Sequence, residues 1–329
     1  MPQVSLIIPG DTDFGHYFHK EQQTTNTIDI QQNFNGDFKI AGMRNRLLVG
    51  LDFYNRNIID NGSGWMWARN VNPQGDVNYV DPYTGDTTAT VDLTRASIDN
   101  LLAGSGVANS NISNSSYSAY FSDVINITPA FSAMVSLRGD YFVSKGEVTT
   151  KGDDFNQFAV SPKIGLVYQP ILDKVSVFAN YMNAFINVAP QSVADEDGSN
   201  PRVISFKPEH ADQWEFGVKA NLFSDKLNGT FSYYNIKVVD RVNPDPANQN
   251  NVIQGGRVRS KGFELDLNAN PAPGLNLIAG YSHNNIKTLK GAATDFYSEP
   301  GRNPGGQGPQ DQVNFWATYK IKPPCQTYV

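Results

Sequence analysis

Apolar and polar residues alternate along most of this chain. Between Trp214 and Leu222 every second residue is apolar, and Glu215 and Lys219 stand between them. A period of two places successive side chains on opposite faces of a β-strand. The alternation recurs in segments at residues 47–54, 135–143, 227–233, 263–270, 275–284 and 313–320. The pattern predicts an all-β chain whose strands have one apolar and one polar face.

The number and the length of these segments favour a membrane barrel. We expect about eleven strands, most of them about 10–14 residues long. Strands of globular proteins centre on about 5–6 residues, whereas a tilted strand that crosses a membrane needs about 9–11. The predicted length therefore suits strands that cross a membrane.

Short and long links are expected to alternate between the strands. The short links are predicted near residues 41–45, 127–132, 170–174, 223–226 and 271–274. The long links are predicted near residues 58–112, 146–156, 188–209, 239–256 and 288–310. An antiparallel meander then has all short turns at one end and all long loops at the other, as outer-membrane barrels do. We predict an antiparallel up-and-down meander that is part of a transmembrane outer-membrane β-barrel.

The energetics of lipid contact predict which face points outward. A charged side chain on the lipid face costs roughly 2–4 kcal/mol at the membrane midplane. The charged residues are therefore expected to point into the barrel; they are Glu215, Lys219, Glu264 and Asp266. Aromatic residues near strand ends are expected to form girdles at the membrane interface. These aromatic residues are Phe223, Tyr281, Trp316 and Tyr319.

Composition narrows the classes of function. The net charge is -6, with a pI near 5.2, and the sequence has no basic cluster, so a nucleic-acid partner is not expected. One cysteine, Cys325, excludes an internal disulfide framework and a site with several thiolates. Residues 1–13 do not resemble a secretory signal, which an outer-membrane protein needs. Either the membrane interpretation is wrong, or the chain lacks the start of its parent.

Six segments, in order, resemble those of one receptor family. Phe206–Glu209 followed by Trp214–Lys219 is similar to a "KPE…E-x-G-x-K" segment, and Arg259–Leu265 to an "R-S-x-G-x-E" strand. The other segments are Leu47–Phe53, Ser161–Tyr168, Leu227–Lys237 and Pro273–Ser282. Together they resemble the TonB-dependent ferric-siderophore receptors.

The resemblance implies a specific architecture and function. It implies a 22-stranded barrel of which residues 1–329 supply about half as one partial domain, with the plug domain and the remaining strands absent. It also implies an outer-membrane receptor, not an enzyme, whose substrate is a ferric siderophore. Its partners are outer-membrane lipid and, through the missing plug, the TonB–ExbB–ExbD system. No cofactor is expected, since iron enters only with the substrate.

Other functions remain open at this stage. A passive porin, or a TonB-dependent receptor for cobalamin, haem or sugar, would have a similar strand pattern. A soluble or surface-displayed β-sheet binding module is the alternative outside membranes.

The sequence offers little catalytic or metal chemistry. His16 and His19 are three residues apart, which suits a metal on a helix but not on a strand or loop. Residues 195–198 resemble the start of a calcium loop, but the glycine comes too early and no glutamate closes the motif, so a solvated acidic loop is expected. We predict no catalytic residue and no metal site.

One long link suggests substrate recognition. Residues 60–90 gather aromatic side chains and an arginine, which suit a flat, anionic ferric chelate through stacking and cation–π contact. The predicted contact residues are Trp65, Trp67, Arg69, Tyr79 and Tyr83. Alternatively, these side chains anchor the membrane interface or hold the loop together.

Overall fold

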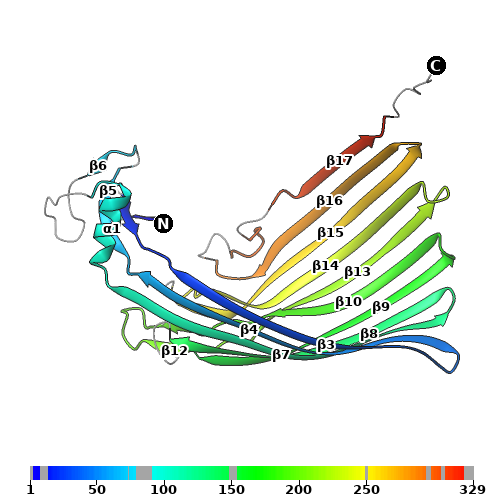
Figure 1. Cartoon of the computed structure of the whole chain (residues 1–329), viewed down its shortest axis with the longest axis horizontal. Coiled ribbons are helices and arrows are strands. Elements are labelled where there is room, and N and C mark those ends of the chain that lie inside the picture. The colour runs from blue at the N-terminus through cyan, green and yellow to red at the C-terminus, as the bar shows by residue number, and fades with distance from the viewer. Residues whose placement is uncertain are drawn as a thin grey trace, which may run out of the picture. The chain divides into compact units, whose positions relative to one another are not determined.

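The fold is nearly all β. The structure, a computed structural model, describes residues 3–7, 14–72, 74–78, 91–147, 154–248, 251–293, 298–304 and 308–321. Eleven strands form one antiparallel sheet in which successive long strands of the chain are neighbours (Figure 1). From edge to edge they are β17 (Asp311–Tyr319), β16 (Leu275–Lys290), β15 (Val252–Ala272), β14 (Leu227–Pro244), β13 (Glu209–Leu222), β10 (Val175–Ile186), β9 (Phe155–Ile171), β8 (Phe131–Glu147), β7 (Val107–Thr128), β4 (Met43–Ser63) and β3 (Gln23–Ile40). The predicted up-and-down meander and its strand number are confirmed.

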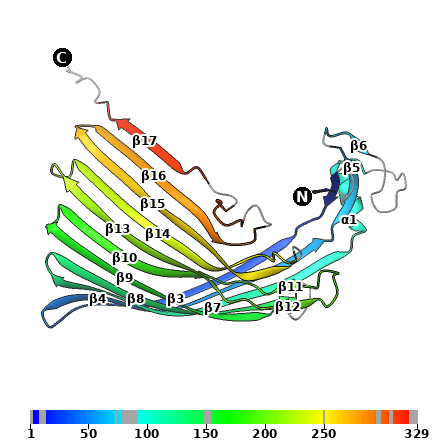
Figure 2. The ribbon, with the colours of Figure 1, turned by 180° about the vertical axis from the view of Figure 1, so that it is seen from behind.

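The links between these strands alternate as predicted. The short turns lie at residues 41–42, 129–130, 172–174, 223–226 and 273–274. The first is a two-residue turn in which Ala41 and Gly42 both have positive φ (49° and 82°), as tight hairpins require. Figure 2 shows the short turns together at one end of the sheet. Within the described residues, β3 and β17 are the two edges, so the sheet does not close on itself.

Several strands are longer than the sequence predicted. β7 has 22 residues, and β4 and β15 have 21 each, whereas most strands were expected to have about 10–14. The alternation of side chains reports only the part of a strand with one apolar face. Backbone pairing continues beyond it into the links that were predicted to be irregular. Strand length was therefore underestimated at the long-loop end.

The registers confirm the two faces of the sheet. Phe216 lies opposite Tyr233, and Val218 opposite Phe231. Residues directly opposite each other in an antiparallel ladder share a face. On β13–β16 one face therefore carries Trp214, Phe216, Val218, Phe231, Tyr233, Phe263, Leu265, Leu267 and Tyr281. The other face carries Glu215, Lys219, Thr230, Ser232, Glu264, Asp266 and Ser282.

Trp316 does not belong to the apolar face. It lies opposite Ile278, which lies opposite Asn268, so all three share the face that carries Asp266. Its assignment to an outer aromatic girdle was wrong. The reason is register: Trp316 falls among the polar positions of its own strand, between Asn314 and Thr318. Tyr281 and Tyr319 remain on the apolar face.

A second, smaller sheet lies in the long link between β4 and β7, joined by the N-terminal segment. Its strands are β1 (Gln3–Ile7), β2 (Phe14–Phe18), β5 (Met66–Val71) and β6 (Val77–Asn78), in that order. Helix α1 (Arg95–Ala103) begins after Thr94, whose side chain accepts a hydrogen bond from the Ser97 amide. Ile98 and Leu102, one turn apart on α1, pack with Phe18 and Ala68 in a small core. A short hairpin of β11 (Gln191–Val193) and β12 (Arg202–Ile204) lies in another link.

The chain forms two compact units. The first comprises Met1–Asp29, Tyr54–Ser115 and Ser144–Asp154, and the second comprises Ile30–Phe53, Ser116–Val143 and Phe155–Val329. The first unit therefore contains the small sheet and α1, and the second contains most of the large sheet. The assignment of residues 1–329 to one barrel domain stays a prediction. No helix in the described part of the chain is long and apolar enough to cross a membrane.

Candidate functional site

The polar face of the large sheet carries a hollow of about 650 Å³. Five neighbouring strands, β9, β10, β13, β14 and β15, contribute charged, amide and hydroxyl side chains to it. These residues are Lys163, Asn180, Glu215, Lys219, Ser232, Glu264 and Asp266. Alternation puts them there, because each one falls at a polar position between apolar residues. The hollow contains cations and anions on one wall, which suits a hydrated surface and not a buried reaction centre.

Specific contacts order part of this hollow. Asn180 donates a hydrogen bond to Glu215 at 3.2 Å, and the Lys219 Nζ lies 5.8 Å from the centre of the Phe178 ring. Gly217 makes room for that ring, since a Cβ at this position would come within 2.6 Å of it. The Lys219 ammonium is therefore held by a cation–π contact while it stays available to a ligand.

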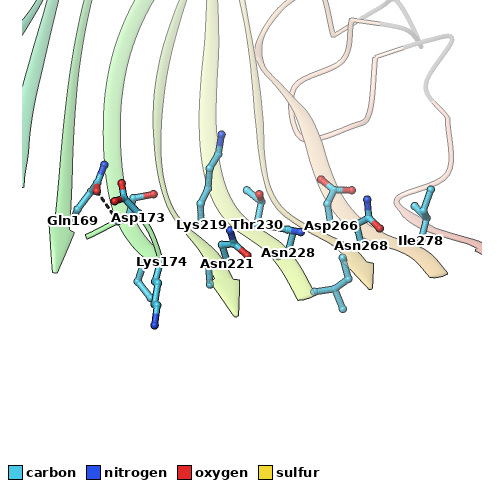
Figure 3. A pocket seen from close by; sticks show the side chains of 15 residues that line it. Gln169, Asp173, Lys174, Lys219, Asn221, Asn228, Thr230, Asp266, Asn268 and Ile278 are labelled. Carbon is cyan, nitrogen blue, oxygen red and sulfur yellow. Dashed lines mark hydrogen bonds between the residues drawn. The ribbon is translucent and has the colours of Figure 1, made fainter. Parts of the chain in front are cut away.

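A second hollow, of about 420 Å³, lies close to the short turns (Figure 3). In this view Lys219 and Asp266 lie at the rim of the hollow, and the side chain of Gln169 points toward the turn that follows β9. The side-chain oxygen Oε1 of Gln169 accepts a hydrogen bond from the backbone N–H of Asp173 at 3.1 Å. The charged side chains predicted to point away from lipid thus line two adjoining hollows of one polar face.

Further along the same sheet, Arg138 forms an ion-pair network across strands β4 and β8. Its guanidinium lies 2.9 Å from Asp52 and 2.9 Å from Asp140, and Ser118 donates to Asp140 at 2.6 Å. The Arg138 guanidinium also lies over the Tyr120 ring, 5.3 Å from its centre. The alternation in residues 135–143 places Arg138 and Asp140 on the polar side of their strand, but nothing in the sequence indicates that Asp52 is their partner. Because all members of this network are paired with one another, we assign the network to stabilising the wall.

Three of the predicted recognition residues lie in the described part of the first unit. Trp65 precedes β5 and is 48% exposed, and its ring centre lies 3.8 Å from that of His19. Trp67 donates a hydrogen bond to Asn70 at 2.8 Å, and Asn70 is 1% exposed. The other two predicted residues, Tyr79 and Tyr83, lie outside the described residues.

The register of β5 separates Trp67 from Arg69. Trp67 lies opposite Tyr17 and Arg69 opposite His16, with a register shift between these two pairs. Tyr17 and His16 are neighbours in β2 and point to opposite faces. Trp67 and Arg69 therefore lie on opposite faces of the small sheet, and the structure does not gather them on one surface. A one-residue irregularity of this kind leaves no sign in the sequence pattern.

His16 lies directly opposite Arg69 on the face of the small sheet that they share. The His16 Nδ1 and the Arg69 Nε are both buried without a hydrogen-bond partner in the described part of the chain. Burial, and then the charge of Arg69, lower the pKa of His16 below its ordinary value. Both effects favour the neutral form of the His16 imidazole. His19 belongs to the contact with Trp65, so the structure brings the two histidines to different places.

The first unit also has a polar hollow of about 790 Å³. It lies between the ends of β3 and β4 and helix α1, and the sequence did not indicate it. Its lining includes Lys20, Glu21, Gln22, Ser63, Arg95 and Asp99. Arg95 and Asp99 pair at 3.6 Å across one helical turn, both well exposed. The hollow therefore offers hydrogen-bond donors and a mixed charge to solvent.

The acidic link at residues 195–198 closes on itself. Asp195 accepts hydrogen bonds from Asn200 at 2.7 Å and from Arg202 at 3.2 Å. These bonds, the one from Asn200 first, lower the pKa of Asp195 below its ordinary value. Among the residues that the structure describes, no group of three histidine, cysteine or acidic side chains is arranged to hold a metal ion.

Comparison with protein families identifies the fold. The sequence model of the family described as "TonB dependent receptor-like, beta-barrel" matches residues 4–327, almost the whole chain. The chain belongs to the TonB-dependent receptor β-barrel family.

Known members of this family share part of the sequence. The ferripyoverdine receptor of Pseudomonas aeruginosa is 28% identical over 169 residues, which are 49% of this chain and 19% of that receptor. The ferric-pyoverdine 358 receptor of Pseudomonas putida is 22% identical over 336 aligned residues, 96% of this chain and 35% of that receptor. This TonB-dependent receptor barrel therefore spans well under half the length of either relative. The relatives are receptors and not enzymes.

A solved structure shows the same fold. The ferric preacinetobactin receptor from Acinetobacter baumannii matches with a TM-score of 0.69 at 16% identity, over 96% of this chain and 44% of that one. Barrels of the TonB-dependent receptor family lie in the outer membrane of Gram-negative bacteria, which is the location of this chain. The apolar face of the sheet therefore meets lipid and the polar face is the inside of the wall, because charges in lipid are costly.

Proposed function

We propose that this chain forms part of the wall of a receptor that imports ferric siderophores across the outer membrane, with energy delivered through TonB. The proposal rests above all on the eleven-stranded sheet, whose outer face is apolar and whose inner face is charged. The names of the relatives supply the substrate class, since both are receptors for ferric pyoverdines. The ferric chelate is the cargo of this transport, and the wall needs no resident cofactor to guide it.

The inner face suits a path for a charged chelate. Lys163 and Lys219 alternate there with Glu215, Glu264 and Asp266, so neither sign dominates the wall. An inner wall whose charges all had the same sign would bind ions of opposite charge tightly and repel ions of the same charge. A wall with charges of both signs stays hydrated and lets a large polar solute move along it. The inner wall is therefore a conduit and not the main source of affinity.

Affinity for the chelate is assigned to the first unit. Trp65 presents an exposed ring supported by His19, which suits stacking against a flat ligand. Lys20 and Arg95, in the hollow beside α1, supply cations for an anionic chelate. Trp67 serves the fold through Asn70, and Arg69 lies on the other face beside His16. Trp65 is thus the member of the predicted set that we assign to contact with substrate.

Energy coupling is assigned to the whole receptor. The TonB–ExbB–ExbD system would act on a plug domain inside the closed wall. The role of this chain is to form the wall against which that domain moves. Passive diffusion through a porin needs no such coupling, so the energy requirement separates the two functions.

Uptake measurements test the proposal. The receptor that contains this chain is expressed in a bacterium without its own siderophore receptors, with and without the tonB gene. We expect uptake of radioactive iron given as ferric pyoverdine or ferrioxamine, and loss of that uptake without TonB. Labelled cyanocobalamin and haemin serve as control substrates. Uptake that is equal without TonB, or uptake of cobalamin or haem alone, contradicts the proposal.

A further inference from the structure

One acid lies in a row of apolar residues on β7. Asp123 occupies the alternate position between Phe121 and Ile125, and Ile127 is the next residue of the row. Phe121 and Ile127 are both exposed, as residues that face lipid are. An ionisable side chain on a lipid-facing surface is costly, and such residues usually have a specific partner. Asp123 therefore calls for a partner.

Contacts between strands fix the side of the sheet on which Asp123 lies. The side chain of Met134, on β8, packs against Gly165 in the inner hollow. Every second residue of β8 counted from Met134, including Asp140, therefore points inward. Ser118 of β7 donates a hydrogen bond to Asp140 at 2.6 Å, so every second residue of β7 counted from Ser118 points inward as well. Asp123 falls on the alternate positions and points to lipid.

Asp123 lies close to the middle of the membrane. It is five residues from Thr128, the last residue of β7 before the short turn. Five residues rise about 17 Å along a strand, or roughly 12 Å across a membrane at the usual tilt. The apolar band of such barrels is about 25 Å tall, so this depth is far from both headgroup layers. The carboxyl group of Asp123 therefore cannot be paired with interfacial water or headgroups.

In the described part of the chain Asp123 has no partner. Its Oδ1 atom is buried without a hydrogen-bond donor, and no salt bridge among the described residues involves it. Asp212 also lies on the outer face, but near the long loops, and it accepts hydrogen bonds from Tyr181 at 2.7 Å and from Asn183 at 2.8 Å. The acid nearer the long loops is thus satisfied within the chain, whereas the acid at mid-membrane is not.

The residues around Asp123 on the outer face offer no side-chain donor. Asn126 donates a hydrogen bond to Ser132 at 2.8 Å between β7 and β8. In that register Val135 lies opposite Asp123. The outer positions nearest to it along the two strands are apolar as well; they are Phe121, Ile125, Ala133 and Leu137. A side-chain donor for Asp123 would have to come from another molecule in the membrane.

A second copy of the protein supplies such a donor at the matching depth. Identical copies in one membrane have the same direction and the same depth, so a two-fold axis normal to the membrane brings equal residues together. Two carboxyl groups that share a proton form a hydrogen bond with each other, and polar groups of this kind hold membrane segments together. We propose that two copies associate side by side through the lipid face of β7 and β8, with Asp123 of each copy bonded to the partner's Asp123.

Cross-linking in the outer membrane tests the contact. Val135→Cys keeps Asp123 and places a thiol beside the proposed axis, in the receptor that contains this chain with Cys325→Ser. A short bismaleimide is expected to link this variant into dimers in isolated outer membranes. Val218→Cys, on the lipid face of β13 at a similar distance from its short turn, is the control and is expected to stay monomeric. Absence of dimers with Val135→Cys, or equal cross-linking of the control, overturns the proposal.

Variants of the acid itself test the hydrogen bond. Asp123→Leu removes the polar group from the lipid face and is expected to weaken the dimer of the purified receptor about tenfold. Asp123→Asn keeps both a donor and an acceptor and is expected to keep the dimer. Sedimentation equilibrium in nonionic detergent measures the association, and heat-modifiable migration shows that each variant is folded. A monomeric unchanged receptor, or a dimer of Asp123→Leu that is as strong as the unchanged one, contradicts the proposal.

Discussion

The imidazole of His19 lies against the indole of Trp65, with ring centres 3.8 Å apart and planes inclined by 37°. The contact joins the segment after β2 to the segment before β5, within the first unit. It leaves 48% of Trp65 exposed, so one side of the ring is held while the other meets solvent. A supported aromatic ring loses little conformational entropy on binding, which makes it a good contact for a flat ligand.

The first prediction concerns this ring. Trp65→Ala is expected to weaken ferric siderophore binding about tenfold, because a stacking contact of about 1.5 kcal/mol is lost. Binding is measured by isothermal titration with the ferric siderophore on the receptor that contains this chain. Trp214→Ala, which removes an exposed ring from the lipid face, is the control and is expected to keep the affinity. If Trp65→Ala leaves the affinity for the ferric siderophore unchanged, the Trp65 ring does not contact the substrate and serves only to hold the loop together.

Trp67 is expected to matter for stability instead. Its indole N–H donates to Asn70, which is buried. Asn70→Ala leaves that N–H without its acceptor and is expected to lower the free energy of unfolding of the first unit by about 1–3 kcal/mol. Hydrogen exchange of β5 amides measures the change. Asn72→Ala, next to β5 but more exposed, is the comparison, and equal effects of the two would contradict the role of Asn70.

The Arg138 network offers a contrast between half-buried and exposed ion pairs. Arg138→Ala leaves Asp140, whose side chain is 7% exposed, without its cation, and is expected to cost about 3 kcal/mol of stability. Arg44→Ala breaks the pair with Asp37, in which both side chains are more than half exposed, and is expected to cost at most about 1 kcal/mol. Denaturation of the detergent-solubilised chain compares the two. Similar costs would show that Arg138 does not brace the wall.

The lipid-facing side of the wall is tested by charge insertion. Phe216→Arg or Leu265→Arg, in the receptor that contains this chain, is expected to reduce assembly into the outer membrane, since each places a cation against lipid at a cost of roughly 2–4 kcal/mol. Lys219→Arg on the inner face is expected to assemble normally. Assembly is measured by heat-modifiable migration of membrane extracts. Normal assembly of both apolar-face variants would reverse the assignment of the faces.

Acid is expected to loosen the first unit through His16. Burial and Arg69 favour the neutral imidazole in the folded unit, while the unfolded chain has the ordinary pKa of 6.5. Below pH 6.5 the His16 imidazole therefore takes up a proton when the unit unfolds. The contribution of neutral His16 to the free energy of unfolding is complete above pH 6.5 and is lost as the pH falls toward the lowered pKa of His16 in the folded unit. Limited proteolysis at pH 7.5 and pH 5 measures it. His16→Phe should remove the difference, and a persisting difference would assign it to other groups.

The sequence predicted the parts of this fold that follow from alternation. It located the eleven strands, the five short turns and the charged face, because each depends on the order of residues within one strand or turn. Trp316 was wrongly assigned to the outer face because the assignment relied on its aromatic side chain and not on whether its position in the strand is odd or even. Helix α1 and the small sheet were missed, since their packing joins residues 14–18 to residues 66–102, which no local pattern records. For the same reason the sequence did not reveal His19 as the support of Trp65.

The direction of the two edge strands has a consequence for any closed form of this wall. β3 leads into the short turn at residues 41–42, and β17 follows a long link, so both run from the long-loop end to the short-turn end. Suppose that two copies of this chain stood side by side in one barrel, so that β3 of one copy paired with β17 of the other. These two strands would then be parallel, whereas all other neighbouring strands are antiparallel. A closed wall that keeps every neighbour antiparallel must insert an odd number of strands between β17 and β3. Eleven further strands satisfy this parity and give the 22 of the plugged transporters.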